Sequence, residues 1–362
     1  MRILLTAGGT GGHIQPILAV VSELERIAQE KKIPLEFLWI GGKEGPEREF
    51  AQNKNIPFKG ISVGKIRRYF SWQNIVDFFK IPQGIIQAFS IVRKFKPDKV
   101  FGKGGYVSVP GVLASWLLHR SIIIHESDSI PGLANRFLSH FATKIAISFE
   151  ECERYFPKDK CVLTGNPIRS EILEGSKERG FSYFKLSKDK PTIFVTGGSQ
   201  GARAINEIVK KAMPELLKIC QVIHQAGVQS AKFKVQSSKL GYRQYGFLNV
   251  QEMADAYAIA DLIIARTGSN TLFELAALEK PSILIPLPTS AQNHQLRNAR
   301  IFEESGAAQV ILQKDLTQQV LLKNIKDILD NKEKLEEMSR NVSKLARLDA
   351  AKKIAEIIIA DC

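Results

Sequence analysis

Short apolar runs alternate with longer segments of helical periodicity along most of the chain. The runs are continuous stretches of Ile, Val and Leu, not alternations of apolar and polar residues. Continuous runs of this kind are typical of parallel strands that are covered on both faces. The predicted strands are 2–6, 35–40, 99–101, 121–125 and 144–147 in the first half, and 192–195, 222–225, 242–246, 262–265 and 282–285 in the second. Helices are predicted at about 14–30 and 45–54, in segments between the later strands, and over 334–360. The pattern therefore predicts an α/β protein.

The alternation of strands and helices occurs twice, once in each half of the chain. Two such passes predict two Rossmann-like domains, each a doubly wound parallel sheet. The turn-forming stretch 164–169 follows the last predicted strand of the first half and is the candidate boundary. We assign residues 1–164 to the first domain and 165–345 to the second. The C-terminal helix, about 346–362, is expected to cross back and pack on the first domain.

The composition is that of an ordinary soluble globular protein. Of the 362 residues, 44% are hydrophobic and 24% are charged. The start of the chain lacks the pattern of a secretion signal, and no window offers the roughly 18 to 20 apolar residues of a membrane span. The four cysteines form no C-x-x-C pair and no zinc spacing with the six histidines. We expect a cytoplasmic protein with reduced thiols and no metal centre.

Two glycine loops each follow a predicted strand and precede a predicted helix. They read Gly8-Gly-Thr-Gly-Gly-His13 and Gly197-Gly-Ser-Gln-Gly-Ala202. Such loops allow positive φ and a close ligand approach, and the helix N-terminus attracts phosphate. Ligands bind at the carboxyl ends of parallel strands, so two loops predict two nucleotide-fold halves that face a common cleft. The dinucleotide fingerprint is disfavoured because Ile14 and Ser199 stand where it needs glycine, and neither loop ends as a P-loop does. Tight turns without a ligand are the alternative.

Further polar clusters stand at predicted strand ends. They are Phe101-Gly-Lys-Gly-Gly-Tyr-Val-Ser-Val-Pro110, expected to form a flexible loop with the cation Lys103, Ile124-His-Glu-Ser-Asp-Ser-Ile-Pro-Gly132, the segment 265–274 and the amide-rich segment 288–298. The turn 268–271 opens a helix and can seat a diphosphate. Glu274, one turn on, could accept hydrogen bonds from a ribose or simply complement the helix dipole. No Asp-x-Asp triplet occurs, so Arg169 and the helix ends would have to neutralise a diphosphate leaving group.

The net charge of +14 is unevenly distributed. The stretch 54–103 is rich in Lys and Arg, has only Asp77 and Asp98 as acidic residues, and is interleaved with aromatic residues. Basic and aromatic side chains together favour the surface of an anionic membrane. The residues proposed to touch it are Lys65, Ile66, Arg67, Arg68, Tyr69, Phe70 and Trp72. Single-stranded nucleic acid binding and a solvated basic face over core aromatics are the alternatives.

In combination, these motifs resemble one family. The shared motifs, in order, are Gly8-Gly-Thr-Gly-Gly-His13, Gly102-Lys-Gly-Gly-Tyr106, His125-Glu-Ser-Asp128 with Pro131-Gly-Leu-Ala-Asn135, Gly165-Asn-Pro-Ile-Arg169, Gly197-Gly-Ser-Gln-Gly-Ala202, Arg266-Thr-Gly268 with Glu274, and His294-Gln295 with Asn298-Ala299. The chain resembles the MurG-type UDP-N-acetylglucosamine:N-acetylmuramyl-(pentapeptide) pyrophosphoryl-undecaprenol N-acetylglucosamine transferases, which have the GT-B fold. The resemblance covers almost the whole chain.

The resemblance implies an inverting glycosyltransferase of peptidoglycan synthesis. Such an enzyme moves N-acetylglucosamine from UDP-N-acetylglucosamine to the C4 hydroxyl of the muramyl sugar of lipid I, which forms lipid II. It needs no cofactor, binds no nucleic acid, and is a peripheral protein on the cytoplasmic face of the plasma (inner) membrane. Its product serves cell wall biogenesis and hence cell shape, cell division and the cell cycle.

The resemblance also implies roles for individual residues. The donor would contact Thr10, Gly11, Gly12, Asp128, Arg169, Ser199, Val250, Ser269, Asn270, Thr271, Glu274, Gln295 and Asn298, with the backbone of Val250 on uracil. Lipid I would lie against Gly104, Gly105 and Tyr106, with 66–81 touching the bilayer. His13 is the candidate base for the acceptor hydroxyl, since imidazole titrates near neutral pH and His13 stands at a helix start. Glu126 is the alternative base, and His13 could instead only orient the acceptor.

Three other functions stay open on the sequence alone. A diacylglycerol glycosyltransferase would share the cleft and the basic face. A UDP-N-acetylglucosamine 2-epimerase would share the fold but have no lipid acceptor. A nucleic-acid-binding protein would use the basic stretch without any enzymatic activity.

Overall fold

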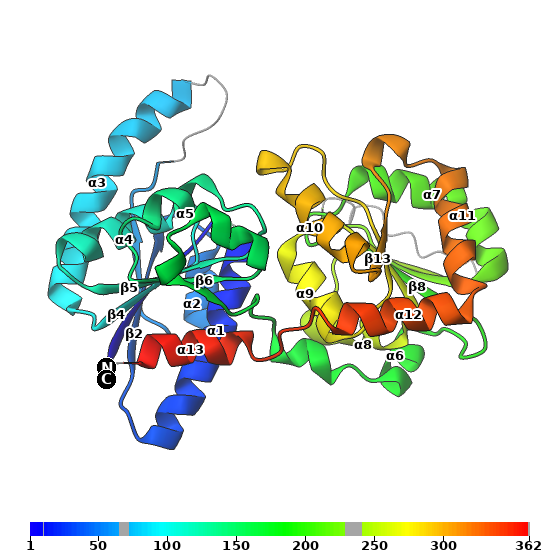
Figure 1. Ribbon diagram of the computed structural model, residues 1–362, viewed down its shortest axis with the longest axis horizontal. Helices are drawn as coiled ribbons and strands as arrows, with labels where there is room; N and C mark the ends of the chain where they lie inside the picture. Colours follow the sequence, from blue (N-terminus) through cyan, green and yellow to red (C-terminus); the bar gives the residue numbers. More distant parts are fainter. Residues whose placement is uncertain (10, 65–71, 229–240, 361–362) are drawn as a thin grey trace. The chain divides into compact units, whose positions relative to one another are not determined.

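The computed structural model describes residues 1–9, 11–64, 72–228 and 241–360, and the chain forms two compact units (Figure 1). Unit 1 comprises Met1–Arg169 and Leu348–Cys362, and unit 2 comprises Ser170–Arg347. The division falls at the end of the turn-forming stretch 164–169. The predictions for Thr10 and for residues 65–70 concern positions outside the described residues.

Unit 1 is built on a parallel sheet with the strand order β3-β2-β1-β4-β5-β6-β7. Its strands are β1 (Arg2–Thr6), β2 (Glu36–Gly42), β3 (Phe58–Ile61), β4 (Lys99–Gly102), β5 (Ser121–Glu126), β6 (Lys144–Ile147) and β7 (Cys161–Leu163). Its helices are α1 (Gly11–Lys31), α2 (Glu47–Asn53), α3 (Trp72–Phe95), α4 (Ser108–Leu117), α5 (Leu133–Leu138) and α13 (Ala350–Ile359), with short 3-10 turns at Glu150–Tyr155 and Lys158–Lys160.

The central strand β1 shows why the strands of this unit are continuously apolar. Successive side chains of a strand point to opposite faces of the sheet. Ile3 and Leu5 pack in one hydrophobic cluster with residues of α1 and α13, and Leu4 packs in another with residues of α3 and α4. Helices therefore bury both faces. In Figure 1, α13 lies beside α1, so the end of the chain completes the layer on one face of this sheet.

Unit 2 repeats this plan with the strand order β10-β9-β8-β11-β12-β13, again all parallel. Its strands are β8 (Thr192–Thr196), β9 (Gln221–Gln225), β10 (Tyr242–Tyr245), β11 (Leu262–Ala265), β12 (Ser282–Leu284) and β13 (Ala308–Val310). Its helices are α6 (Lys177–Phe184), α7 (Arg203–Ile219), α8 (Val250–Ile259), α9 (Ser269–Ala277), α10 (His294–Glu304), α11 (Gln318–Leu329) and α12 (Lys332–Ser343), with 3-10 turns at Ser170–Glu174, Ala291–Asn293 and Gln313–Asp315.

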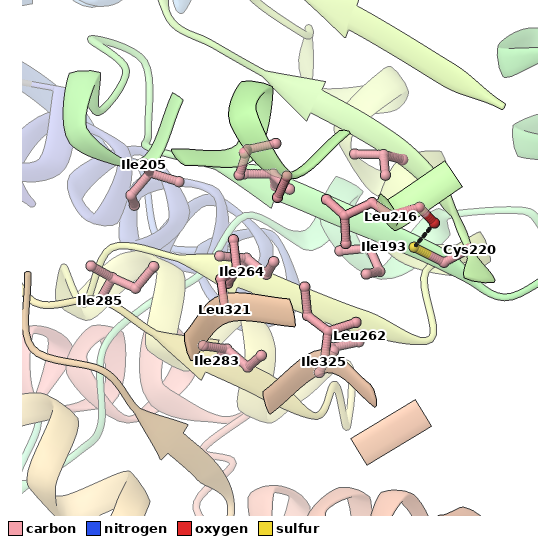
Figure 2. Close-up of a cluster of buried hydrophobic side chains, with 14 of the residues drawn as sticks. Ile193, Ile205, Leu216, Cys220, Leu262, Ile264, Ile283, Ile285, Leu321 and Ile325 are labelled. Atoms are coloured by element: carbon pink, nitrogen blue, oxygen red, sulfur yellow. Dashed lines mark hydrogen bonds between the residues drawn. The ribbon is translucent and has the colours of Figure 1, made fainter. Parts of the chain in front are cut away.

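The core on one face of the second sheet joins strands to α7 and α11. Figure 2 shows Ile264 and Ile283 of the strands together with Leu321 of α11. At the end of α7 the Cys220 thiol lies 3.3 Å from the carbonyl oxygen of Leu216 and donates to it. This core fixes the strand ends from which the glycine loop and α9 begin.

The predicted fold class is confirmed, and every predicted strand is present with small shifts of its ends. The strands β3, β7 and β13 escape prediction because each has three or four residues and forms a sheet edge. The helical tail predicted over 334–360 is two helices, since α12 packs within unit 2 and α13 packs on α1. Within the described ranges, no helix combines the length and apolarity that crossing a bilayer requires.

Candidate active site

Two glycine segments of unit 1 meet at the carboxyl ends of β1 and β4. Gly9 has a φ of 93°, and a Cβ at this position would lie 3.5 Å from the ring of Tyr106. Gly105 has a φ of 76°, and a Cβ there would lie 3.6 Å from Nε2 of His13. The structure therefore brings together three residues that the sequence assigns to the base and the acceptor site, His13, Gly105 and Tyr106.

Lys103 is buried beside this group, so the expectation of a cation on a flexible loop is wrong. Its side chain is only 1% exposed, and Nζ makes no hydrogen bond to the described residues. Burial lowers the pKa of Lys103 to about 8, although the carboxylates of Glu126 and Asp128 oppose the shift. The sequence shows no sign of this, because the loop Gly102-Lys-Gly-Gly looks like an exposed turn.

The imidazole of His13 is held in its neutral form. Burial first, and the positive charge of Lys103 second, lower the pKa of His13 to about 4, with Asp128 acting in the opposite direction. At neutral pH His13 thus has an unprotonated ring nitrogen, which is what a base requires.

Replacing Lys103 with methionine should therefore change the pH response of the protein. Without the ammonium group of Lys103, the pKa of His13 rises. As the solution is made more acidic, activity that requires neutral His13 should therefore be lost at a higher pH than in the wild type. The pH profile of kcat/KM measures this limb. Lys99→Met is the matched control, because Lys99 is also buried and stands at the start of β4, but its Nζ lies 3.5 Å from Ser121 Oγ. An unmoved acidic limb in Lys103→Met would contradict the coupling.

Glu126 organises the loop after β5. Its Oε1 accepts from the N–H of Asp128 at 3.1 Å, and its Oε2 accepts from the N–H of Gly132 at 3.1 Å and from Asn135 Nδ2 at 2.9 Å. Burial and the neighbouring Asp128 raise the pKa of Glu126. Both oxygens are occupied by donors, so this arrangement favours a role in shaping the loop over the role of an alternative base. Gly104, with a φ of 85°, packs directly against the amide of Asn135.

His125 supports the same strand end from inside. Its Nε2 lies 3.1 Å from the carbonyl oxygen of Gly165 and 3.1 Å from Ser148 Oγ. Burial and then Lys103 hold the pKa of His125 well below its usual range. This buried histidine connects β5 to the turn after β7 and is a structural group.

In unit 2 the second glycine loop lines a pocket of about 660 Å³. The lining comes from the loop itself, the start of α7, the end of β11 with the start of α9, and the 287–313 region: Gly197, Gly198, Gln200, Gly201, Ala202, Arg203, Ala204, Glu207, Arg266, Gly268, Thr271, Leu287, Gln295 and Gln313. Two helix N-termini therefore border one pocket, an arrangement that suits a diphosphate. Thr271 and Gln295, both assigned to the donor, line it.

Hydrogen bonds hold three of the assigned residues at or near this pocket. Glu274 is buried in α9, where its Oε2 accepts from the hydroxyl of Tyr257 at 3.4 Å. Gln295 Oε1 accepts from the N–H of Leu287 at 3.0 Å, which fixes the amide at the pocket wall. Asn298 is fully buried and its Nδ2 donates to the carbonyl of Thr267 at 3.4 Å, so it supports the turn below the pocket.

Arg266 is a site residue that the sequence assignments omit. Nη1 donates to the carbonyl oxygens of Ile285 and Pro286 at 3.0 and 3.2 Å, and Nη2 donates to Gln313 Oε1 at 2.6 Å. These acceptors are neutral, and burial lowers the pKa of Arg266. A guanidinium nevertheless keeps its charge in proteins. A fixed guanidinium at a pocket wall is a strong anion site. The sequence could have identified Arg266 as a site residue by its position directly after the predicted strand 262–265.

The remaining residues assigned to the donor or to the membrane do not line the pocket of unit 2. Ser199 is exposed on the second glycine loop, while Ser269, Asn270 and Val250 lie in the first turns of α9 and α8. Gly11 and Gly12 are exposed at the start of α1, Asp128 and Arg169 are half-buried in unit 1, and the side chain of Trp72 is not described. Among the described residues no group of His, Cys, Asp or Glu is arranged to hold a metal ion.

Two doubly wound parallel sheets, with a pocket at a glycine loop of the second, have the GT-B architecture, and the matching family models make the protein a glycosyltransferase. Residues 3–147 match the glycosyltransferase family 28 N-terminal domain, and residues 192–354 match the glycosyltransferase family 28 C-terminal domain. The chain belongs to the family of UDP-N-acetylglucosamine–N-acetylmuramyl-(pentapeptide) pyrophosphoryl-undecaprenol N-acetylglucosamine transferases, as the following relatives show. The resemblance inferred from the motifs is thereby confirmed.

A transferase of this name from Bacillus cereus is 41% identical over 92% of both chains, and one from Clostridium perfringens is 42% identical over 92% of this chain and 91% of its own. The crystal structure of MurG from Acinetobacter baumannii superposes with a TM-score of 0.77 at 29% identity, covering 99% of this chain and 98% of that one. The UDP complex of MnaA from S. aureus, with a TM-score of 0.71 and 16% identity over 98% and 95% of the two chains, shares the fold.

Proposed function

We propose that this protein transfers N-acetylglucosamine from UDP-N-acetylglucosamine to the C4 hydroxyl of the muramyl sugar of lipid I, with inversion, to form lipid II. The observation that carries the proposal is the similarity to transferases of that name along 92% of both chains. The pocket of unit 2 supports it, since its size and its anion-binding groups suit a nucleoside diphosphate.

The donor would bind unit 2 through separate groups for each of its parts. The glycine loop with Ser199, the start of α9 and Arg266 would hold the diphosphate and stabilise the charge on departing UDP. Glu274 would accept hydrogen bonds from the ribose, the backbone of Val250 would contact uracil, and the amide of Gln295 would bind sugar hydroxyls. Arg169, Asp128 and the loop at Thr10, Gly11 and Gly12 would contact the donor from unit 1.

The acceptor would bind unit 1, on the segment 104–106 and near His13. The neutral imidazole of His13 would take the proton from the C4 hydroxyl as its oxygen attacks the anomeric carbon opposite UDP. Most of the rate enhancement would come from aligning the two substrates. No metal takes part in this scheme, because Arg266 and the helix N-termini supply the positive charge.

Lipid I is held in a membrane, and unit 1 has a surface suited to it. Trp116 and Phe137 are exposed, and each ring packs edge to face on Phe141, at centroid distances of 4.9 and 5.1 Å. Exposed aromatic side chains enter the interfacial region of a bilayer, and neighbouring cations attract anionic headgroups. We place the protein at the cytoplasmic face of the plasma membrane as a peripheral protein, serving cell wall growth and division.

Replacing Lys65, Arg67 and Arg68 with glutamate should weaken binding to anionic vesicles at least about a hundredfold, since each basic residue near the surface contributes on the order of 1 kcal/mol. UDP affinity should not change. Vesicle sedimentation and calorimetry measure the two quantities. The control replaces Lys323, Lys326 and Lys332, exposed in unit 2, with glutamate. An equal loss of vesicle binding in the control, or a loss of UDP affinity in the triple variant, would contradict the separation of the two surfaces.

The proposed function is tested by following UDP release from UDP-N-acetylglucosamine with and without a soluble lipid I analogue. We expect release only when the analogue is present. An epimerase would instead convert the donor sugar without any acceptor, and a lipid glycosyltransferase of another kind would require diacylglycerol. Either of those results would overturn the proposal.

A further inference from the structure

A buried carboxylate lies beneath the first glycine loop. Glu47, the first residue of α2, has no exposed surface. Its Oε1 accepts from the N–H of Gly42 at 2.7 Å, and its Oε2 accepts from the N–H of Gly9 at 3.3 Å. The side chain thereby links the end of β2 to the loop that follows β1, 38 residues earlier in the chain.

Glycines around Glu47 leave space for this carboxylate. A Cβ at Gly8 or at Gly45 would lie well inside contact distance of Oε1, and a Cβ at Gly41 would lie 2.6 Å from Cγ. None of these three glycines has a positive φ, so the backbone conformation does not require glycine there. At Gly8 and Gly45 close approach of the Glu47 side chain is the reason that a larger residue does not fit, and at Gly41 the ring of Phe58 crowds the position as well.

The two glycine loops, which look alike in sequence, therefore differ in chemistry. In unit 2 the N–H of Gly198 donates to the neutral hydroxyl of Thr196 at 3.2 Å, and the loop borders the pocket of about 660 Å³. In unit 1 the N–H of Gly9 is already bound to an anion that belongs to the protein itself. The second loop is open to an external diphosphate, whereas the first holds an internal carboxylate.

We propose that Glu47 is a positioning residue, which fixes the first glycine loop and thereby sets the start of α1 and the place of His13. A buried carboxylate is costly unless hydrogen bonds compensate it, so the loop and the end of β2 are held where their N–H groups reach its oxygens. Gly9 is separated by only a few residues from His13, and both pack against the segment 105–106. The inference rests on the role proposed for His13.

The test is Glu47→Gln, which keeps the shape of the side chain but offers only one acceptor oxygen for two N–H groups. We expect kcat at saturating donor and acceptor to fall at least about tenfold, because one hydrogen bond to a charged group is lost and the amide nitrogen faces a donor. UDP affinity should fall less than kcat does, because the pocket that we assign to the diphosphate lies in unit 2. Amide hydrogen exchange should become faster at residues 8–13. Glu49→Gln, an exposed glutamate in the same turn of α2, is the matched control.

A second pair of variants keeps the test decisive if Glu47→Gln does not fold. Gly8→Ala should lower kcat in the natural background, because the new methyl group displaces the carboxylate, but should change kcat less than about twofold in a Glu47→Ala background. Additive effects of the two changes would overturn the proposal. So would unchanged kcat and exchange in Glu47→Gln, a fall in kcat without faster exchange, or an equal loss of UDP affinity. A wild-type protein without transfer activity would instead refute the proposed function, while the exchange measurement would still test the position of the loop.

Discussion

His13→Ala is expected to lower kcat by about 10² to 10⁴-fold, the range that a general base contributes. The variant should fold normally and bind UDP as the wild type does, because the pocket that we assign to UDP belongs to unit 2. Initial rates with a lipid I analogue and calorimetry with UDP measure the two properties. His140→Ala, which removes an exposed imidazole of the same unit, is the control.

The pH dependence of kcat/KM is a second test of His13 as the general base. The base acts when neutral, and its pKa is lowered to about 4, so kcat/KM should fall only as the pH drops through about 4. An ordinary histidine would lose activity below about 6.5. An anionic acceptor beside His13 would raise this pKa, so the acidic limb of kcat should lie above that of kcat/KM. Near-normal turnover of His13→Ala would remove it as the base.

Arg266→Met is expected to weaken UDP binding by about 10 to 100-fold, since hydrogen bonds to charged groups contribute on the order of 1.5 to 3 kcal/mol. The guanidinium is already oriented by Ile285, Pro286 and Gln313, so it loses little freedom when a phosphate binds. The change should raise the donor KM and leave the acceptor KM unaffected.

The control for Arg266 is Arg243→Met. Arg243 also donates to backbone carbonyls, those of Phe184, Tyr242 and Lys185, but it does not line the pocket. Calorimetric titration with UDP compares the variants directly. If Arg243→Met weakens UDP binding as much as Arg266→Met does, the effect of Arg266 is structural and not electrostatic.

The fold could be predicted from the sequence because its strands are buried on both faces. The run Ile3-Leu-Leu5 is apolar throughout, since alternate residues enter different clusters, and this removes the ambiguity of a half-exposed strand. Edge strands such as β7 lack that signal because they are short and only partly buried. The break between α12 and α13 follows from packing in different units, which local helix propensity does not encode.

The arrangement of the candidate site could be predicted where a motif fixes local geometry, and not where distant segments decide it. The glycine loops and Thr271 stand where strand ends place them, and Gln295 reaches the same pocket. Lys103 is buried near Glu126 and Asp128, which come from β5 and its loop. The hydrogen bonds of Glu47 join the loop after β1 to the end of β2. Neither feature has a local sequence signature, since a lysine between glycines and a glutamate at a helix start normally face solvent.

The most direct test of the account is to identify the product made from UDP-N-acetylglucosamine and a soluble lipid I analogue, with EDTA present throughout. Mass spectrometry and NMR of the purified product give its composition, linkage and anomeric configuration. The account predicts one added N-acetylglucosamine, linked β to the C4 hydroxyl of the muramyl sugar, at a rate that EDTA does not change. An α linkage, attachment to another hydroxyl, loss of activity in EDTA, or no product despite UDP binding would contradict it.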